Sequence, residues 1–164
     1  MELAVSDTFI AATSIIILLI YMLVCVFLKA VVQPIRQLKK TMADILCTFS
    51  RYTNVIHYAD VIPPDLHSEA YEKLRRLSNQ LYDDMSLIPE WFFNFPYFSR
   101  VFSLPKEEMV YKSARNLTAT TNWMYVQHKS KLNYIVKNIQ TACDNLGLYI
   151  DPKDRITNKH LNYD

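Results

Sequence analysis

The chain has 164 residues, a formal net charge of +2 and one glycine, Gly147. Sheet-rich folds and phosphate-binding loops use glycine for backbone conformations with positive φ, so this composition argues against both. A helical chain needs few glycines, and we therefore expect an all-α fold that consists of one small domain and an anchor.

An uncharged stretch near the N-terminus predicts a single transmembrane helix. Residues 9–28 read FIAATSIIILLIYMLVCVFL, and twenty helical residues span about 30 Å, the thickness of a bilayer's hydrocarbon core. Its Phe, Ile, Leu and Val residues together favour insertion by roughly 4–8 kcal/mol. A cleaved signal peptide and a buried core helix are the alternatives. The signal peptide is disfavoured because the run is long, and because no basic residue precedes it and no small-residue cleavage site follows it.

Basic residues predict how the chain is oriented. All 18 Lys and Arg residues follow Leu28. The flank of the anchor is marked by Lys29, Arg36, Lys39 and Lys40. The positive-inside rule places this flank in the cytoplasm and residues 1–8 outside it, as a short extracytoplasmic tail. We expect a single-pass protein of the cell (inner) membrane, with its N-terminus out and a cytoplasmic C-terminal domain.

A seven-residue repeat follows the anchor, in a juxtamembrane amphipathic helix expected over residues 29–60. The candidate association stripe consists of Leu28, Val31, Ile35, Leu38, Met42, Ile45, Phe49, Tyr52 and Ile56. This spacing is typical of a coiled coil between copies of the chain, and it equally fits a helix that packs on the chain's own later helices. We expect packing within the chain for the distal half and association between copies near the bilayer.

The segment VVQPIRQLKKTM resembles the start of a HAMP linker, the signal-relay module that follows the last membrane helix of bacterial receptors. The matching residues are Pro34, Ile35 and Leu38, just inside the membrane. The glycine-containing connector and the second amphipathic helix of HAMP are missing, because HYADVIPPD follows instead. We interpret the likeness as a shared physical solution to leaving the membrane.

A helical bundle is expected over residues 65–150, followed by a polar tail over residues 151–164. Its first helix should start near Ser68. The apolar face of that helix comprises Ala70, Leu74, Leu77, Leu81 and Met85, spaced at helical intervals. Two more helices should follow. One starts behind Ser103 as a possible cap and runs to about Gln127. The other carries apolar residues from Leu132 to Leu146, with Gly147 placed for a left-handed C-cap.

An aromatic stretch, PEWFFNFPYFSRVF, lies between the first two of these helices, and Pro96 prevents one continuous helix there. The candidate partner or interface aromatics are Trp91, Phe92, Phe93, Phe95, Tyr97 and Phe98. Three interpretations remain open. The stretch can fill the core as broken helical turns, line a groove for a ligand or partner, or rest as a wedge in the membrane interface.

No motif predicts a catalytic residue, a cofactor or a metal site, because none of the four histidines has a metal-binding spacing. In size and class the chain resembles the all-helical HEPN ribonucleases, which use an Arg followed after four to six residues by a His. The pairs Arg51–His57 and Arg155–His160 fit that spacing. The resemblance implies a pair that polarises a phosphate and moves a proton. Such spacings also arise by chance, and we do not expect an enzyme.

We therefore expect a membrane-anchored helical interaction module, an adaptor or a subunit of a membrane-associated complex without catalysis of its own. Its partners would be the lipid bilayer and an unidentified protein, while nucleic acid is not expected. The alternative is an oligomerising membrane effector that perturbs or permeabilises the bilayer through the polar line Ser14, Tyr21 and Cys25. The span carries no ionisable residue that would mark an ion path, which favours the interaction module.

Overall fold

The computed structural model describes residues 2–57, 64–125 and 131–149 of the chain. Within these ranges every regular element is helical and no strand occurs. The expectation of an all-α fold is therefore confirmed for the part of the chain that the structure describes. The polar tail over residues 151–164 lies outside it, and so does Gln127.

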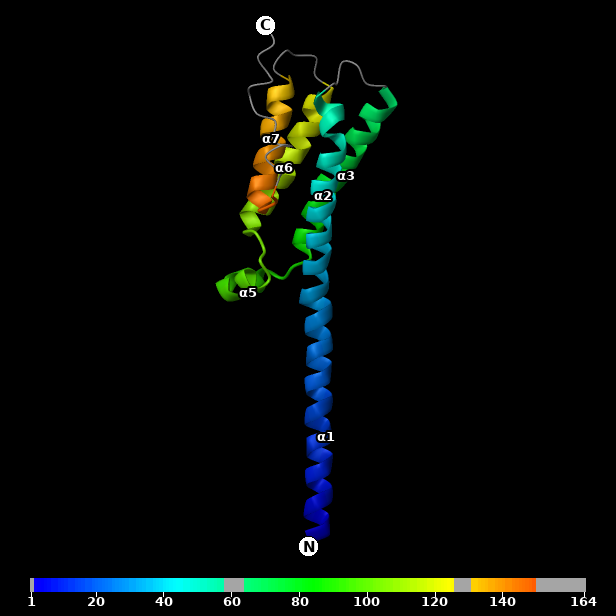
Figure 1. Cartoon of the computed structure of the whole chain (residues 1–164). Helices are drawn as coiled ribbons and strands as arrows, with labels where there is room; N and C mark the ends of the chain where they lie inside the picture. The colour runs from blue at the N-terminus through cyan, green and yellow to red at the C-terminus, as the bar shows by residue number, and fades with distance from the viewer. Residues whose placement is uncertain (1, 58–63, 126–130, 150–164) are drawn as a thin grey trace.

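A single rod runs from the N-terminus into the bundle (Figure 1). It consists of α1 (Glu2–Phe27), the π-helical turn η1 (Leu28–Val32) and α2 (Gln33–His57), without a break. Pro34 lacks the N–H that would bond the carbonyl four residues back, and its ring would crowd that carbonyl. The π-turn widens the helix just before the proline, where Gln33 N–H bonds the oxygen of Leu28. The rod therefore passes the proline instead of ending there.

The first half of the rod is exposed and apolar. All side chains from Ala11 to Val26 are exposed, and Phe27 is the first that packs against the core of the bundle. The rod contains the one helix in the described residues that is long and apolar enough to cross a membrane, judged by length and composition. Because these side chains cover every side of α1, no face of it is reserved for the chain's own bundle.

The second half of the rod forms one wall of a four-helix bundle with α3 (Pro64–Ser86), α6 (Glu107–Met124) and α7 (Lys131–Leu146). The helices pack in the cyclic order α2, α3, α6, α7. Each contributes large side chains to a common core, such as Ile45, Leu81, Leu117 and Ile139, which are 0–1% exposed. The expected apolar face of α3, from Ala70 to Met85, is buried throughout.

Buried hydrogen bonds join neighbouring helices of the bundle. They connect Thr41 Oγ1 to the Asp84 carboxyl group (2.5 Å), Ser78 Oγ to Ala114 O (2.7 Å) and Ser113 Oγ to Ala142 O (3.1 Å). A buried polar group without a partner is costly, so each bond favours one axial register of its two helices. The bonds therefore add specificity to a core whose apolar contacts are not directional.

Two helix boundaries differ from the sequence-based expectation. The helix α3 begins at Pro64, four residues before Ser68, because proline is well tolerated in the first helical turn. The helix α6 begins at Glu107, and its N-cap is Lys106, which makes no side-chain capping bond. The expected cap at Ser103 is therefore wrong.

Ser103 instead ends the preceding helix α5 (Pro96–Val101). Its φ of 48° is left-handed, its N–H bonds Arg100 O at 3.1 Å and the next N–H bonds Ser99 O at 2.9 Å. This is the Schellman arrangement that more commonly uses glycine. Gly147 closes α7 in the same way, with a φ of 67° and with Leu148 N–H bonding Cys143 O at 2.9 Å, so the expectation of a left-handed C-cap is confirmed.

Candidate functional site: the end of the bundle that faces α1

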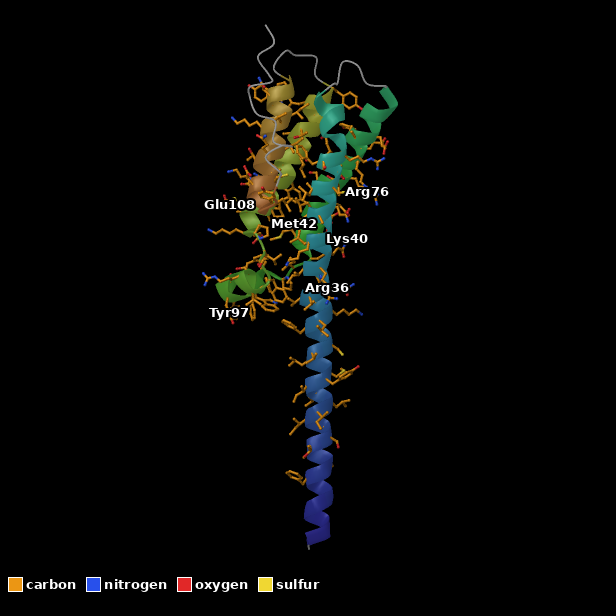
Figure 2. All side chains as sticks on the ribbon, viewed as in Figure 1. Arg36, Lys40, Met42, Arg76, Tyr97 and Glu108 are labelled. Carbon is orange, nitrogen blue, oxygen red and sulfur yellow. The ribbon has the colours of Figure 1, made fainter. Side chains whose placement is uncertain are left out.

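The basic flank lies where the rod enters the bundle. Lys29, Arg36, Lys39 and Lys40 are all exposed, and Figure 2 shows Arg36 and Lys40 along this part of the rod. These side chains are free to reach an anionic surface because none of them belongs to the core of the bundle.

An open groove of about 570 Å³ follows this part of the rod. It is lined by Cys25, Leu28, Lys29, Val32, Gln33 and Arg36. Its lining is apolar toward α1 and carries an ammonium and a guanidinium group toward α2. Apolar side chains followed along the rod by cationic groups suit a phospholipid, whose acyl chains adjoin a charged headgroup.

The candidate association stripe is placed mostly inside the chain's own bundle. Val31, Ile35, Leu38, Met42, Ile45 and Phe49 are 0–8% exposed, whereas Leu28 is 51% exposed. The side chains of Tyr52 and Ile56 lie outside the described residues. Val31 and Ile35 are thus buried by the chain's own bundle, whereas the sequence favoured contact between copies near the bilayer. Among the stripe members whose side chains the structure describes, Leu28 is the one that a second copy can reach without displacing the bundle.

The aromatic residues are divided between an inner and an outer set. They lie on the aromatic elbow, residues 87–102, which contains α4 (Glu90–Asn94) and α5 (Pro96–Val101). Phe92 is fully buried at the centre of the inner set. Its ring centroid lies 5.5 Å from Phe93, 5.6 Å from Phe98 and 5.8 Å from Phe102. These are the distances at which aromatic pairs attract one another beyond their burial.

The outer set points into solvent. Trp91, Phe95 and Tyr97 are 45%, 55% and 73% exposed. Two apolar neighbours that the sequence did not single out, Leu87 and Val101, are 55% and 58% exposed. The sequence could not separate the inner from the outer aromatics because Pro96 interrupts the helical period that would have assigned each residue to a face.

Figure 1 shows that α5 lies at the end of the bundle that faces α1, crosswise to the rod. In Figure 2 the labelled Tyr97 lies at nearly the height of Arg36 along the rod, on the side toward α1. The outer set, the groove and the basic flank therefore occupy one end of the bundle, next to the apolar half of the rod.

No group of three or more His, Cys, Asp or Glu that could hold a metal ion occurs among the described residues. Burial, followed by the nearby charge of Asp144, raises the pKa of the Cys143 thiol to about 11, which makes it a poor nucleophile.

Both candidate ribonuclease pairs fall partly or wholly outside what the structure describes. Arg51 is exposed, but the side chain of His57 is not described, and neither are Arg155 and His160. The side chains of His67 and His128 are likewise outside the described residues, so the HEPN-like hypothesis stays a prediction.

A polar cluster lies on the surface of α3 and α6, where Tyr111 also packs against the edge of the core. Arg115 Nε donates to Tyr82 Oη at 3.4 Å, and the rings of Tyr82 and Tyr111 lie 4.9 Å apart. Burial raises the pKa of the Tyr111 phenol, with smaller contributions from Glu107, Tyr82 and Glu90. The Tyr111 phenol therefore stays protonated at neutral pH, and the cluster can offer hydrogen bonds to a partner.

Comparisons with protein-family models, curated proteins and solved structures found no match to this chain.

Proposed function

We propose that the chain is a membrane-anchored helical interaction module, an adaptor or a subunit of a membrane-associated complex, without catalysis of its own. The observation that carries the proposal is the unbroken rod. Its first half exposes apolar side chains on every side, and its second half buries one face in the bundle. Apolar side chains in such numbers are stable in lipid and unfavourable in water.

The proposed orientation has α1 across the cell membrane, the N-terminus outside and the bundle in the cytoplasm. The first basic residue, Lys29, lies at the C-terminal end of the apolar half, and Arg36, Lys39 and Lys40 follow it as exposed side chains. Exposed cations at this position favour the side of the membrane that bears anionic lipids. The partner of the bundle is proposed to be a protein, because the exposed surface offers scattered aromatic and polar groups.

A pair of C-terminal fusions tests this proposal. A fluorescent reporter that folds only in the cytoplasm should be active, and an alkaline phosphatase that works only after export should be inactive. Both fusions should remain in the membrane fraction after washing at alkaline pH. Activity of the exported reporter would show that the orientation is the opposite one. Release of both fusions into the wash would contradict the membrane anchor.

The oligomerising membrane effector remains the second candidate because the polar line on α1 is exposed. Tyr21 is 65% exposed, and Ser14 and Cys25 are exposed on the same face. Such residues can meet across an oligomer in lipid. Release of a trapped dye from vesicles that contain the full chain separates the two candidates. The interaction module leaves the vesicles intact, whereas the effector empties them, and Tyr21→Leu should then reduce the leakage.

A further inference from the structure

The aromatic elbow has two sides, and only one of them serves the fold. The ring of Phe92 is fully buried, and Phe93, Phe98 and Phe102 are half-buried around it. The other side exposes the outer set, Trp91, Phe95 and Tyr97, together with its neighbours Leu87 and Val101, at 45–73%. Water is a poor environment for five exposed apolar side chains within one short elbow, residues 87–102. The inner rings therefore hold the outer ones in place for a contact outside the bundle.

The place of the elbow in the fold identifies what it contacts. The elbow lies at the end of the bundle that faces α1, and Tyr97 lies on the anchor side of Arg36 (Figure 2). Arg36 follows Leu28 by eight residues, about 12 Å along a helix. The polar headgroup region extends roughly 5–8 Å beyond the hydrocarbon core on each side. With α1 in the bilayer, Tyr97 therefore lies less than about 12 Å beyond the hydrocarbon core, next to the headgroup region.

The inner side of the elbow packs against the same bundle core as the base of the rod. Phe27, in the last turn of α1, packs against the core to which Phe93 and Phe98 of the elbow also contribute. Val31 and Ile35 belong to that core and are 1% and 2% exposed. Figure 1 places the elbow, beside the rod, at the end of the bundle that faces the apolar span.

The polar groups of the elbow are compatible with this placement. Arg100, in the last turn of α5, is exposed and can pair with a lipid phosphate. Glu90 is exposed, and its charge makes a small contribution to the raised pKa of Tyr111 on α6. Trp and Tyr side chains are enriched at membrane interfaces because their rings are apolar and their N–H or O–H groups remain hydrated.

We propose that the outer side chains of the aromatic elbow lie in the headgroup region of a phospholipid bilayer, on the leaflet that Lys29 flanks. This inference rests on the proposed membrane anchor and adds a second point of contact. The bundle is then held to the membrane by the rod and by the elbow, which projects sideways from it (Figure 1). Two separate contacts restrict the tilt of the bundle, which one helix cannot do alone.

Tryptophan fluorescence tests the proposal, because the chain has two Trp residues at opposite ends of the bundle. Trp91 belongs to the elbow, whereas Trp123 is near the end of α6, the helix that runs away from the anchor, and stacks on Tyr134 at 4.6 Å. The full chain is reconstituted in phospholipid vesicles that contain lipid with a spin label near the headgroup. Trp123→Phe reports on Trp91 alone, and Trp91→Phe reports on Trp123 alone. We expect about threefold more quenching for Trp91 than for Trp123.

A charged substitution in the elbow provides a second readout. In the Trp123→Phe background, Tyr97→Asp should reduce the quenching of Trp91 to about the level of Trp123, because a carboxylate disfavours the interface. Tyr125→Asp, at the opposite end of the bundle, is the matched control and should leave the quenching unchanged. Tyr97 and Tyr125 are both well exposed, at 73% and 60%, so both variants should keep the helical circular dichroism of the parent.

Three results would overturn the inference. If the chain floats with the vesicles and Trp91 is quenched no more than Trp123, the membrane anchor is supported and the elbow proposal is wrong. If Trp91 is protected from both the spin-labelled lipid and aqueous acrylamide, a second copy of the chain covers the elbow instead. If the chain does not float with the vesicles at all, the membrane anchor and the elbow contact are both wrong.

Discussion

The buried bond between Thr41 and Asp84 makes a quantitative prediction for the stability of the bundle. Thr41 on α2 is 0% exposed and Asp84 on α3 is 1% exposed, and the hydroxyl donates to the carboxyl group at 2.5 Å. Thr41→Val keeps the shape of the side chain and removes the donor, which leaves a buried oxygen without this partner. Such a loss costs about 1–3 kcal/mol. With an m value of about 2 kcal/mol per molar urea, the unfolding midpoint should fall by roughly 1 M.

The assay is urea unfolding of the full chain in a mild detergent, followed by circular dichroism and Trp fluorescence. Thr120→Val is the matched control, because Thr120 is equally buried but bonds Asn116 O of its own helix at 2.9 Å. That carbonyl keeps its backbone partner, so the control should cost less than about 0.5 kcal/mol.

A double-mutant cycle completes the test of this bond. Asp84→Leu removes the acceptor, and the double variant with Thr41→Val has neither polar group left. We expect the double variant to be more stable than the sum of the two single losses by about 1–2 kcal/mol. Strictly additive losses, or a cost for Thr41→Val as small as for the control, would refute the reasoning that this bond sets the packing of α2 on α3.

Three further predictions concern the stripe, a thiol and a helix end. Ile45→Asp should destabilise the bundle by roughly 2–5 kcal/mol because Ile45 is fully buried; dissociation of oligomers with unchanged urea stability would instead favour an interface between copies. Cys143, with a pKa of about 11, should be only about 0.1% thiolate at pH 8. A maleimide should therefore label the exposed Cys47 at least about tenfold faster, with the rate at Cys143 rising as the pH approaches 11. Equal rates at pH 8 would contradict that burial. Gly147→Ala should cost about 1 kcal/mol by urea unfolding, from its φ of 67° alone, since nothing lies within 4 Å of the added Cβ; a cost near zero would mean that the left-handed cap is dispensable.

Much of the bundle follows from periodicity. The spacing of Leu74, Leu77 and Leu81 marks one face of a helix, and an apolar face on a soluble helix has to be covered. The heptads of α2 predicted burial in the same way, but they could not say which helices would cover them. Only the packing of α2 against α3 and α7 decides that question, because a repeat of seven residues fits both a partner copy and the chain's own bundle.

The parts that sequence reasoning missed depend on contacts between distant residues. The bond from Thr41 to Asp84 joins positions 43 residues apart, and neither side chain is unusual in its local pattern. The sequence predicted a helix start at Ser103 because serine is a common N-cap. The backbone there is instead left-handed and ends α5. In the aromatic elbow, the decisive difference between Phe92 and Phe95 is which side of a broken helix each one occupies.

The unbroken rod also sets how far the bundle can reach. With α1 in the bilayer as proposed, the 30 residues from Leu28 to His57 raise the far end of the bundle about 45 Å above the hydrocarbon core. A tilt of about 20°, the average for membrane helices, would swing that end sideways by roughly 15 Å. A loop of another membrane protein would need at least about 13 extended residues to touch it. Partners with short loops therefore meet this chain at its base, and only proteins with large cytoplasmic parts meet it at its tip.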